Sequence, residues 1–451
     1  MAKAATPFVY FTRLQLTNVR SFAETQSLDL TDGQGAPARW TLILGNNGVG
    51  KTTLLQCLAL MRPVLSAEDG APTNASKPTS VEAALYSHQN AEIVALARHG
   101  ERQIGLEATL SIGGKLSETG QAKTVSTKAS FTVKGDELNS LDPHSEPGVS
   151  EPLVIGYGAA RHARYRNADT FDISGDPTAS LFDPSLELAD AGTILQDLDY
   201  AAYKEQPNAR KFLEAVKVAL ATLLPDVSDA SAIRLYGPAT PGTKNQKTGV
   251  QVVTPYGEVP LASLSLGYQT MTAWAVDLAW RLYQHYPDAE EPLNQPAIVL
   301  IDELDLHLHP RWQRQLRAHI SGAFPAVQFI ATAHSPLLAQ SYLDTNLAVV
   351  REVDGQAVIE NDPPVDGAWR LDEVITSALY EVDSPYSPTI ESDLEARTQL
   401  LQKEKLTPAD KQELERLETL AASLSSPGVS EDREAMDLIR QAAKLLNTGA
   451  A

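Results

Sequence analysis

The sequence predicts an α/β fold, in which helices cover a mixed β-sheet. Apolar runs typical of buried strands alternate with helical patterns: "PAIVLI" precedes "RWQRQLRAHI", which predicts a helix, and "AVQFIATA" follows. The segment "RWTLILGNNGVGKTTLLQCLAL" is typical of a buried strand, a glycine turn and an apolar helix. Strands and helices interleaved in this way indicate a sheet with helices on its faces.

Composition and charge limit the functional classes. The chain has 451 residues, of which 43% are hydrophobic and 21% charged, as in ordinary globular proteins. No apolar run approaches the ~20 residues that span a bilayer, and the N-terminus "MAKAATPFVYF" lacks the apolar segment of a secretory signal. The single cysteine, Cys57, excludes an internal disulfide and fits a reducing compartment. We therefore expect a cytoplasmic protein that does not cross a membrane.

The formal net charge of −20 argues against a protein that coats nucleic acid with its whole surface, because phosphate neutralisation supplies most of that affinity. Any nucleic-acid contact is expected to use a local patch or a partner. The segment "AARHARYR", with Arg161, Arg164 and Arg166, is the candidate patch, and a solvated loop is the alternative.

Secondary-structure patterns follow in order along the chain. "RLQLTNVRSFAETQSLDL", "RQIGLEATLSIGG" and "KASFTVKG" predict strands, and residues 136–151, rich in Pro, Ser, Asp and Glu, predict an exposed loop. "PLVIGYG" predicts another buried strand. Residues 187–223 are helical by periodicity, and a long helix with one apolar face follows residue 264.

The C-terminal tail differs in pattern from the rest. In "LTPADKQELERLETLAASL", Thr407 is the expected N-cap of a helix, with Pro408 and Asp410 in its first turn. An apolar stripe then follows, made of Leu414, Leu417, Ala421 and Leu424. The tail is expected to be a small helical appendage whose stripe serves packing or a partner surface.

A glycine-rich loop gives the first chemical indication. "GNNGVGKT" matches the G-x-x-x-x-G-K-[ST] phosphate loop, with a strand before it and a helix after it. Its backbone N–H groups would surround phosphates at a helix N-terminus, Lys51 would reach the β- and γ-phosphates, and Thr52 would ligate Mg²⁺. The residues predicted to bind ATP phosphates are Gly45, Asn46, Asn47, Gly48, Val49, Gly50, Lys51, Thr52 and Thr53.

The segment "AIVLIDELDLHLHPRWQ" supplies acidic partners for this loop. Its buried strand delivers Asp302 and Glu303 at a carboxyl end, where ligands bind in open α/β sheets. Asp302 is expected to complete the Mg²⁺ shell, and Glu303 to orient the attacking water as general base. The further strand "VQFIATAHSP" ends near His334, which can hydrogen-bond the γ-phosphate.

The motif "LSLGYQT" opens the long helix. Ser265 can cap that helix, and Gly267 leaves room for a phosphate to approach. A serine-capped helix is common, so this motif gains weight from its position between the phosphate loop and the acidic pair.

These motifs together resemble the ABC-type ATPases, in the soluble branch that includes the RecF, Rad50 and SMC heads and OLD-like ATPases. The resemblance rests on "NVRSF", "GNNGVGKTT", "LSLGYQ", "LIDELDLHLHP" and "TAHSP", which occur in the family's order over roughly residues 8–350. It implies a P-loop ABC-ATPase head with a mixed sheet, a helical lobe that carries the signature motif, and the helical appendage. The implied segments are 1–175 (ATPase lobe with the phosphate loop), 176–290 (helical signature lobe), 291–370 (ATPase lobe continued) and 371–451 (appendage).

The resemblance also implies a mechanism, with ATP and Mg²⁺ as cofactors and a homodimer that encloses two ATPs. Ser265 and Gly267 would face the γ-phosphate held by the other subunit, and Asp305 occupies the D-loop position between the two sites. Arg20 and Phe22 fall where the family contacts adenine or ribose, with a surface charge and a core aromatic as alternatives. Hydrolysis is expected to be slow and regulatory.

The chain departs from the family pattern in two ways. The glutamine that lines Mg²⁺ in the family has no clear counterpart, since Gln89 and Gln103 are only candidates. No sustained heptad run predicts the long coiled coil of SMC proteins. His307 and His309 have a spacing that could suit a metal, but hydrogen bonding or packing is the favoured interpretation because a helix starts at Pro310.

The tail "SPYSPTIESDLEARTQLLQKEKLTPADKQELERLETL" resembles that of ATPases encoded beside HNH nucleases in bacterial anti-phage modules of the Septu type. This implies an ATP-sensing subunit that regulates an HNH nuclease partner. Assemblies larger than the homodimer are compatible with this role. The main alternative is a DNA repair or chromosome-maintenance ATPase that clamps DNA directly. A transporter motor is less favoured because of the "HLHP" extension and the acidic tail, and a fused nuclease domain because the tail after residue 370 is helical and short.

Overall fold

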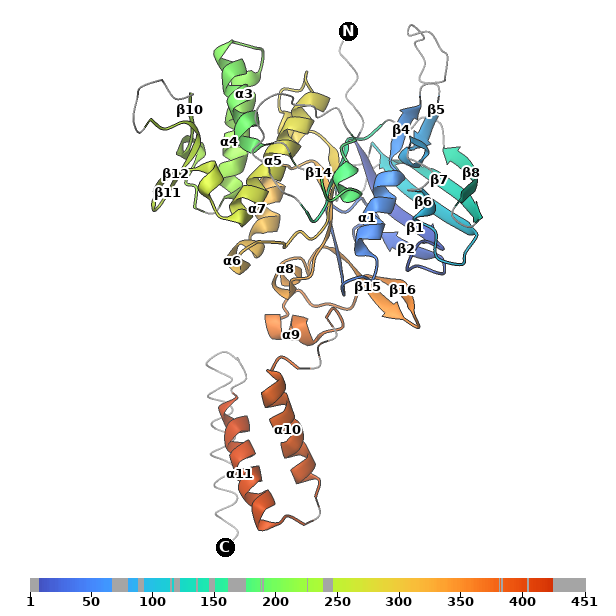
Figure 1. Cartoon of the computed structure of the whole chain (residues 1–451), viewed down its shortest axis with the longest axis vertical. Helices are drawn as coiled ribbons and strands as arrows, with labels where there is room; N and C mark the ends of the chain where they lie inside the picture. Colours follow the sequence, from blue (N-terminus) through green and yellow to red (C-terminus); the bar gives the residue numbers. More distant parts are fainter. Residues whose placement is uncertain are drawn as a thin grey trace. The chain divides into compact units, whose positions relative to one another are not determined.

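The computed structural model divides the chain into two compact units, Met1–Tyr380 and Glu381–Ala451. The larger unit combines two main sheets with helices, and the described part of the smaller unit contains two helices (Figure 1). The structure describes residues 8–66, 80–87, 93–113, 116, 122–134, 137–145, 151–160, 176–186, 188, 190–224, 226–237, 246–380, 382, 384–403 and 405–424. The mixed α/β class predicted from the sequence is confirmed.

The central sheet of the larger unit has six strands in the order β16-β15-β3-β14-β13-β9. Five strands are parallel, and β16 is an antiparallel edge. The strands are β3 (Trp40–Gly45), β9 (Val154–Tyr157), β13 (Ala297–Ile301), β14 (Val327–Thr332), β15 (Asn346–Val353) and β16 (Gln356–Asn361). Strands β3, β14, β13 and β9 are adjacent, so their carboxyl ends meet at one edge of the sheet.

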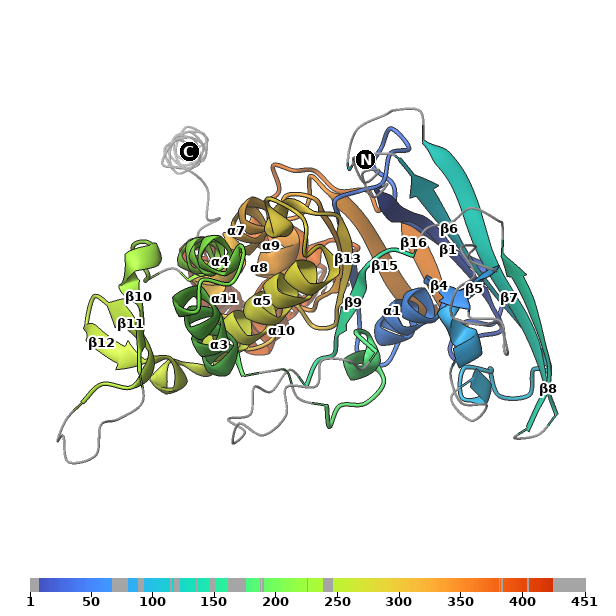
Figure 2. The ribbon, with the colours of Figure 1, turned by 90° about the horizontal axis from the view of Figure 1, so that it is seen from above.

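A second, antiparallel sheet has five strands in the order β2-β1-β6-β7-β8. They are β1 (Val9–Thr17), β2 (Gln26–Asp29), β6 (Gln103–Ile112), β7 (Lys123–Lys134) and β8 (Glu137–Ser145), and a short ribbon of β4 (Pro63–Ser66) and β5 (Ser80–Ala83) precedes β6 in the chain. Helix α1 (Lys51–Leu60) lies between this sheet and the central sheet (Figure 2). Nine of its ten residues are buried, including Cys57, which has no exposed surface. The phosphate loop is therefore attached to a helix packed on both sides.

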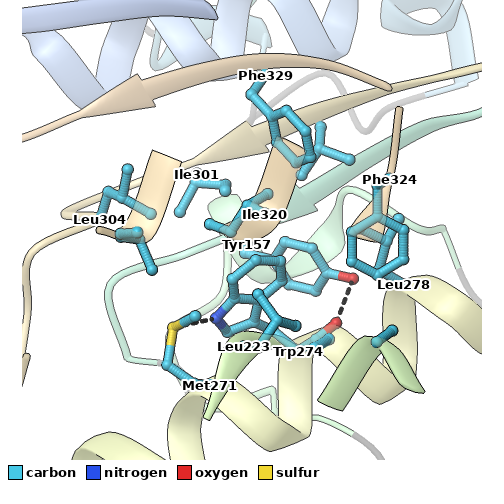
Figure 3. Close-up of a cluster of buried hydrophobic side chains, with 14 of the residues drawn as sticks. Tyr157, Leu223, Met271, Trp274, Leu278, Ile301, Leu304, Ile320, Phe324 and Phe329 are labelled. Atoms are coloured by element: carbon cyan, nitrogen blue, oxygen red, sulfur yellow. Dashed lines mark hydrogen bonds between the residues drawn. The ribbon is translucent and has the colours of Figure 1, made fainter. Parts of the chain in front are cut away.

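Helices cover the other face of the central sheet, where Trp274 and Phe329 are part of one apolar cluster (Figure 3). Short helices follow at the strand ends, and a three-stranded sheet in the order β10-β11-β12 lies beside α3. The elements are α3 (Ala191–Tyr203), α4 (Ala209–Leu223), β10 (Ile233–Tyr236), β11 (Gly249–Thr254), β12 (Gly257–Pro260), α5 (Leu266–His285), α6 (Pro310–Gln313), α7 (Leu316–Ala323), α8 (Pro336–Gln340) and α9 (Leu371–Thr376).

The smaller unit pairs α10 (Pro388–Leu401) with α11 (Pro408–Ser423). Thr407 caps α11 through a reciprocal capping box with Asp410, as the sequence predicts. Leu400 and Leu417 are its buried apolar residues. The division after Tyr380 leaves α9, with its buried Val374, in the larger unit.

Two secondary-structure expectations are wrong. The expected loop over 136–151 contains strand β8 at Glu137–Ser145, which pairs with β7 and packs Leu138 and Leu141 against the core; residues 136 and 146–150 lie outside the described part. Backbone pairing with a neighbouring strand outweighs the low strand propensity of this polar segment. The predicted helix "RWQRQLRAHI" is split into α6 and α7 around Gln315. Within the described ranges, no helix combines the length and apolar character needed to cross a membrane.

Candidate functional site

The phosphate loop joins β3 to α1 and is shaped by glycines at positive φ. Gly45 has φ 142° and Gly50 has φ 109°. A Cβ at Gly45 would lie 2.2 Å from the carbonyl oxygen of Val350, and one at Gly50 would lie 2.8 Å from Cε2 of Phe22. The close approach of β15 at Gly45 and of the segment between β1 and β2 at Gly50 therefore requires glycine at both positions. The crest, Asn46 to Gly48, is exposed.

Lys51 is folded back under this loop. Its Nζ donates hydrogen bonds of 2.8 Å to the carbonyl oxygens of Gly45 and Asn46. Burial lowers the pKa of Lys51 to about 8, although the nearby carboxylates of Asp302, Glu303 and Asp305 act in the opposite direction. The amine is thus a partly desolvated donor at the centre of a concave backbone.

The buried carboxylate of Asp302 connects three elements. Its Oδ2 accepts a 2.8 Å hydrogen bond from the Thr52 hydroxyl at the start of α1. Its Oδ1 accepts one of 2.6 Å from the Thr332 hydroxyl at the end of β14. Its backbone N–H donates to the carbonyl oxygen of Tyr157 on β9. The structure thus brings the phosphate loop and the acidic pair together.

Glu303 is held at the same strand end with an unusual backbone. Its φ of 50° lies in the left-handed region, which non-glycine residues adopt mainly at constrained sites. Its N–H donates a 2.8 Å hydrogen bond to the Thr332 hydroxyl. Thr332 therefore uses one hydroxyl to fix both Asp302 and Glu303, a role that the sequence analysis missed. A threonine at the end of the neighbouring parallel strand was the available signal.

Asp305 and His334 form the next layer of the site. The carboxylate oxygens of Asp305 each lie 3.3 Å from the backbone N of His334, which donates to them. Burial, followed by the charge of Lys51, lowers the pKa of His334, so its imidazole is held towards the neutral form. A neutral imidazole keeps one nitrogen as donor and one as acceptor. The structure thus places His334 near the charged groups around Lys51.

The two histidines of the acidic segment lie apart from the carboxylates. His309 is exposed, and its Nδ1 accepts from the N–H of Arg311 at the start of α6, so it acts as a helix cap. His307 is exposed and has φ 64°. The described residues include no group of three or more His, Cys, Asp or Glu side chains that could hold a metal ion. Thr52 and Asp302 instead offer a hydroxyl and a carboxylate oxygen, the donor types that Mg²⁺ prefers.

The signature motif opens α5. Ser265 is the N-cap residue and is exposed, but its side chain makes no capping hydrogen bond, contrary to the expectation. Gly267 is buried, and a Cβ there would lie 2.5 Å from the carbonyl oxygen of His307. This glycine therefore serves close packing against the acidic segment of the same chain, and it brings the start of α5 beside that segment.

The remaining predicted residues lie in different surroundings. Arg20 donates from Nη1 to the Gln56 side chain at 2.6 Å, on the α1 side of the loop. Phe22 is fully buried beneath Gly50, so the core-aromatic alternative describes it and no surface is left for a base. Gln103 is exposed on β6, where its carbonyl accepts from Asn18. Gln89 and the arginines of the candidate basic patch lie outside the described residues.

Comparisons with known proteins agree with the motif resemblance. Residues 187–339 match a family model described as "AAA domain, putative AbiEii toxin, Type IV TA system", and residues 13–144 match one described as "AAA domain". The chain is 26% identical over 379 residues to the Septu protein PtuA of Bacillus mycoides, across 82% of this chain and 45% of that protein. It is 25% identical over 374 residues to the Retron Vc95 probable ATPase of Vibrio cholerae, across 70% and 69% of the two chains.

The chain thus spans less than half of the length of the Bacillus mycoides relative. Among solved structures, an SMC head domain from Thermotoga maritima matches 79% of this chain and 99% of that domain, with 14% identity and a TM-score of 0.40. The resemblance stated from the motifs, to ABC-type ATPases similar to PtuA, is confirmed by the family and relative matches.

The shared Thr332 hydroxyl gives a stability prediction. Thr332→Val should lower the free energy of unfolding by about 1–3 kcal/mol, because it removes the hydrogen bonds of the Thr332 hydroxyl with Oδ1 of the buried Asp302 carboxylate and with the Glu303 N–H. Thr272→Val is the matched control, since the Thr272 hydroxyl is buried on α5 without a hydrogen-bond partner. Urea unfolding followed by circular dichroism measures both. Equal effects of the two substitutions would show that the Thr332 hydrogen bonds contribute nothing.

Proposed function

We propose that this chain, which is similar to ATPases of the PtuA kind, binds ATP with Mg²⁺ and hydrolyses it slowly in order to control a partner nuclease in anti-phage defence. The observation that carries the ATPase proposal is the 2.8 Å contact of the Thr52 hydroxyl with the Asp302 carboxylate, directly beside the Lys51 amine. A phosphate loop, a cation and paired oxygen donors then converge at one sheet edge.

Binding would use the backbone of Gly45 to Gly50 and the N-terminus of α1. The N–H groups at a helix N-terminus favour phosphate oxygens, and α1 is held rigidly because nine of its ten residues are buried. The Lys51 amine would exchange its two carbonyl partners for phosphate oxygens. Thr52 and Asp302 would hold Mg²⁺, which neutralises charge on the phosphates when bound.

Hydrolysis would depend on the placement of Glu303. Water attacks the γ-phosphorus, a new O–P bond forms, and the bond between that phosphorus and the β–γ bridging oxygen breaks as ADP leaves. The Glu303 carboxylate accepts the proton that the attacking water loses. The Thr332 hydrogen bond to the Glu303 N–H fixes the backbone at this point. The His334 imidazole would hydrogen-bond the γ-phosphate and then the released phosphate.

Two copies would complete two sites between them. The start of α5 is exposed at Ser265 and at Leu266, which has 49% of its surface exposed. Because the Ser265 hydroxyl makes no cap bond, it and the first N–H groups of α5 are available to a γ-phosphate held by the other copy. Asp305 would couple the nucleotide state of one site to that of the other, since its carboxylate already holds the backbone of His334. ATP would thus shift the population towards the closed pair, and hydrolysis would reset it.

The defence role is supported by the relatives named Septu protein PtuA and Retron Vc95 probable ATPase. The partner is proposed to be an HNH nuclease, because the C-terminal tail resembles that of ATPases encoded beside HNH nucleases. The net charge of −20 favours a protein partner over direct coating of nucleic acid.

Glu303→Gln should lower kcat for ATP hydrolysis at least about 100-fold, because the general base is lost. It should preserve ATP binding, so that the closed pair accumulates. Lys51→Ala should remove ATP binding, because the phosphate-facing cation is lost. Phosphate release, nucleotide titration and size-exclusion chromatography with ATP measure the three effects. Glu352→Gln on β15 is the control, since it is exposed and makes the same charge change. Normal hydrolysis by Glu303→Gln would refute the assignment of the base.

ATP affinity should fall roughly tenfold between pH 7.5 and pH 9.0. Burial lowers the pKa of Lys51 to about 8, so the unliganded amine is mostly charged below that pH and mostly neutral above it. Only the charged amine attracts phosphate strongly. Lys51→Arg keeps its charge over this range and should show no such decline, whatever its affinity at pH 7.5. Equal pH profiles of the two proteins, measured by titration calorimetry, would contradict the role of Lys51.

The tagged chain should co-purify an HNH nuclease from its native host, and ATP should change the cleavage of plasmid DNA by that complex. The Lys51→Ala chain should retain the nuclease but lose the response to ATP. Retention of plasmid DNA by the purified chain alone, with no nuclease partner, would instead favour the DNA-clamping alternative.

A further inference from the structure

Tyr157 touches the candidate site through its backbone. It ends β9 and lies opposite Ile301 in the parallel register with β13. Its carbonyl oxygen accepts a 2.8 Å hydrogen bond from the N–H of Asp302. A shift of Tyr157 would therefore move the residue that holds the Thr52 hydroxyl.

The side chain of Tyr157 extends in another direction, to α5. Its hydroxyl donates to Oδ2 of Asp277 at 2.8 Å, and the carbonyl oxygen of Trp274 lies 3.3 Å away. Figure 3 shows the Tyr157 and Trp274 rings side by side; their centroids are 5.9 Å apart. The Tyr157 side chain is only 1% exposed, so this contact is made inside the core between sheet and helix.

Asp277 is an unusual residue to find at this point of α5. It is 1% exposed among apolar neighbours, and its Oδ2 also accepts a 2.8 Å hydrogen bond from Nε of Arg281 one turn later. A buried carboxylate is costly unless it is paired and hydrogen-bonded. Apolar side chains would pack this interface without that cost. The hydrogen bond between Tyr157 and Asp277 instead fixes the orientation of α5 relative to β9, which packing alone would not do.

Two contacts, one at Gly267 and one at Asp277, fix the direction of α5. At its start, Gly267 packs directly against the carbonyl of His307 in the acidic segment. Asp277 lies ten residues further on, or about 15 Å along a helix. The buried apolar side chains of α5 hold it by packing, which is non-directional, whereas the Gly267 contact and the Asp277 hydrogen bond fix two separated points along its axis. The exposed Ser265 at the tip therefore has a set position relative to Asp302 and Glu303.

We propose that Tyr157 and Asp277 are positioning residues: their hydrogen bond aligns the start of α5 with the catalytic strand end, and hydrolysis by the closed pair depends on it. The proposal rests on the proposed ATPase function for its kinetic consequence, and on geometry alone for its structural one. It also supplies a connection between α5 and the nucleotide site.

The experiment compares Tyr157→Phe and Asp277→Ala, which remove the donor and the acceptor of this hydrogen bond, with Tyr10→Phe. Tyr10 is equally buried, and its hydroxyl donates at 2.7 Å to the carbonyl of Ala326, which precedes β14 at the opposite end of that strand from Thr332. Tyr157→Phe should leave the Kd for ATP within about twofold and lower kcat at least about tenfold. Tyr10→Phe should leave both unchanged for the folded protein. A kcat for Tyr157→Phe equal to that of Tyr10→Phe would overturn the proposal.

Hydrogen exchange of the nucleotide-free chain gives a readout that does not require ATPase activity. The amides in the first half of α5 should exchange at least about tenfold faster in Tyr157→Phe and Asp277→Ala than in the wild type, because the helix loses the hydrogen bond that connects it to the end of β9. Unchanged protection there overturns the proposal even if the wild type hydrolyses ATP. If the variants exchange faster than the wild type but the wild type does not hydrolyse ATP, only the proposed ATPase function is refuted.

A double-mutant cycle closes the test. Because Tyr157 and Asp277 act through one hydrogen bond, the double variant should resemble the more affected single variant in exchange rate and kcat. Independent, multiplying effects would show that the two residues act separately, and would overturn the pairing. If one single variant fails to fold, the other single variant still tests the proposal by comparison with Tyr10→Phe.

Discussion

The candidate site depends on the carboxylate of Asp302, whose two oxygen atoms are held by hydroxyls from two different elements. Thr52 approaches from the phosphate loop and Thr332 from β14, while the backbone N–H is held by β9. A buried carboxylate with fewer donors would be strongly disfavoured, so these contacts have to form together. The adjacency of β3, β14, β13 and β9 is what allows it. Strand order is thus a chemical requirement of this fold as well as a topological one.

The sequence predicts the parts of the site whose information is local. A glycine loop between a strand and a helix places Lys51 at the helix start, and an acidic pair after four apolar residues places Asp302 and Glu303 at a strand end, by short-range pattern alone. Helix starts with strong capping chemistry, such as Thr407 and Asp410, are predicted equally well. The break between α6 and α7 could not be predicted in this way. The Gln313 amide donates to the carbonyl of Leu308 and accepts from the hydroxyl of Ser335, and these contacts depend on the tertiary fold.

What the sequence could not predict are pairings between distant segments. Strand β8 is polar and resembles a loop, and only its register with β7 makes it a strand. Tyr157 and Asp277 are separated by 120 residues, and nothing in either neighbourhood marks the pair. Phe22 likewise looked like a ligand contact by position, yet the approach of Gly50 shows that it supports the loop from below. In each case the deciding interaction comes from a segment that no local window includes.

The burial of α1 has a practical consequence through Cys57. This is the chain's one cysteine, and burial raises the pKa of its thiol to about 12. Alkylating reagents react with an accessible thiolate, so Cys57 becomes modifiable only when α1 separates from the packed sheets. The rate of modification under native conditions therefore counts openings of the helix that carries the phosphate loop. The unaltered chain thus contains a chemical reporter of how firmly its nucleotide loop is anchored, and of any ligand that anchors it further.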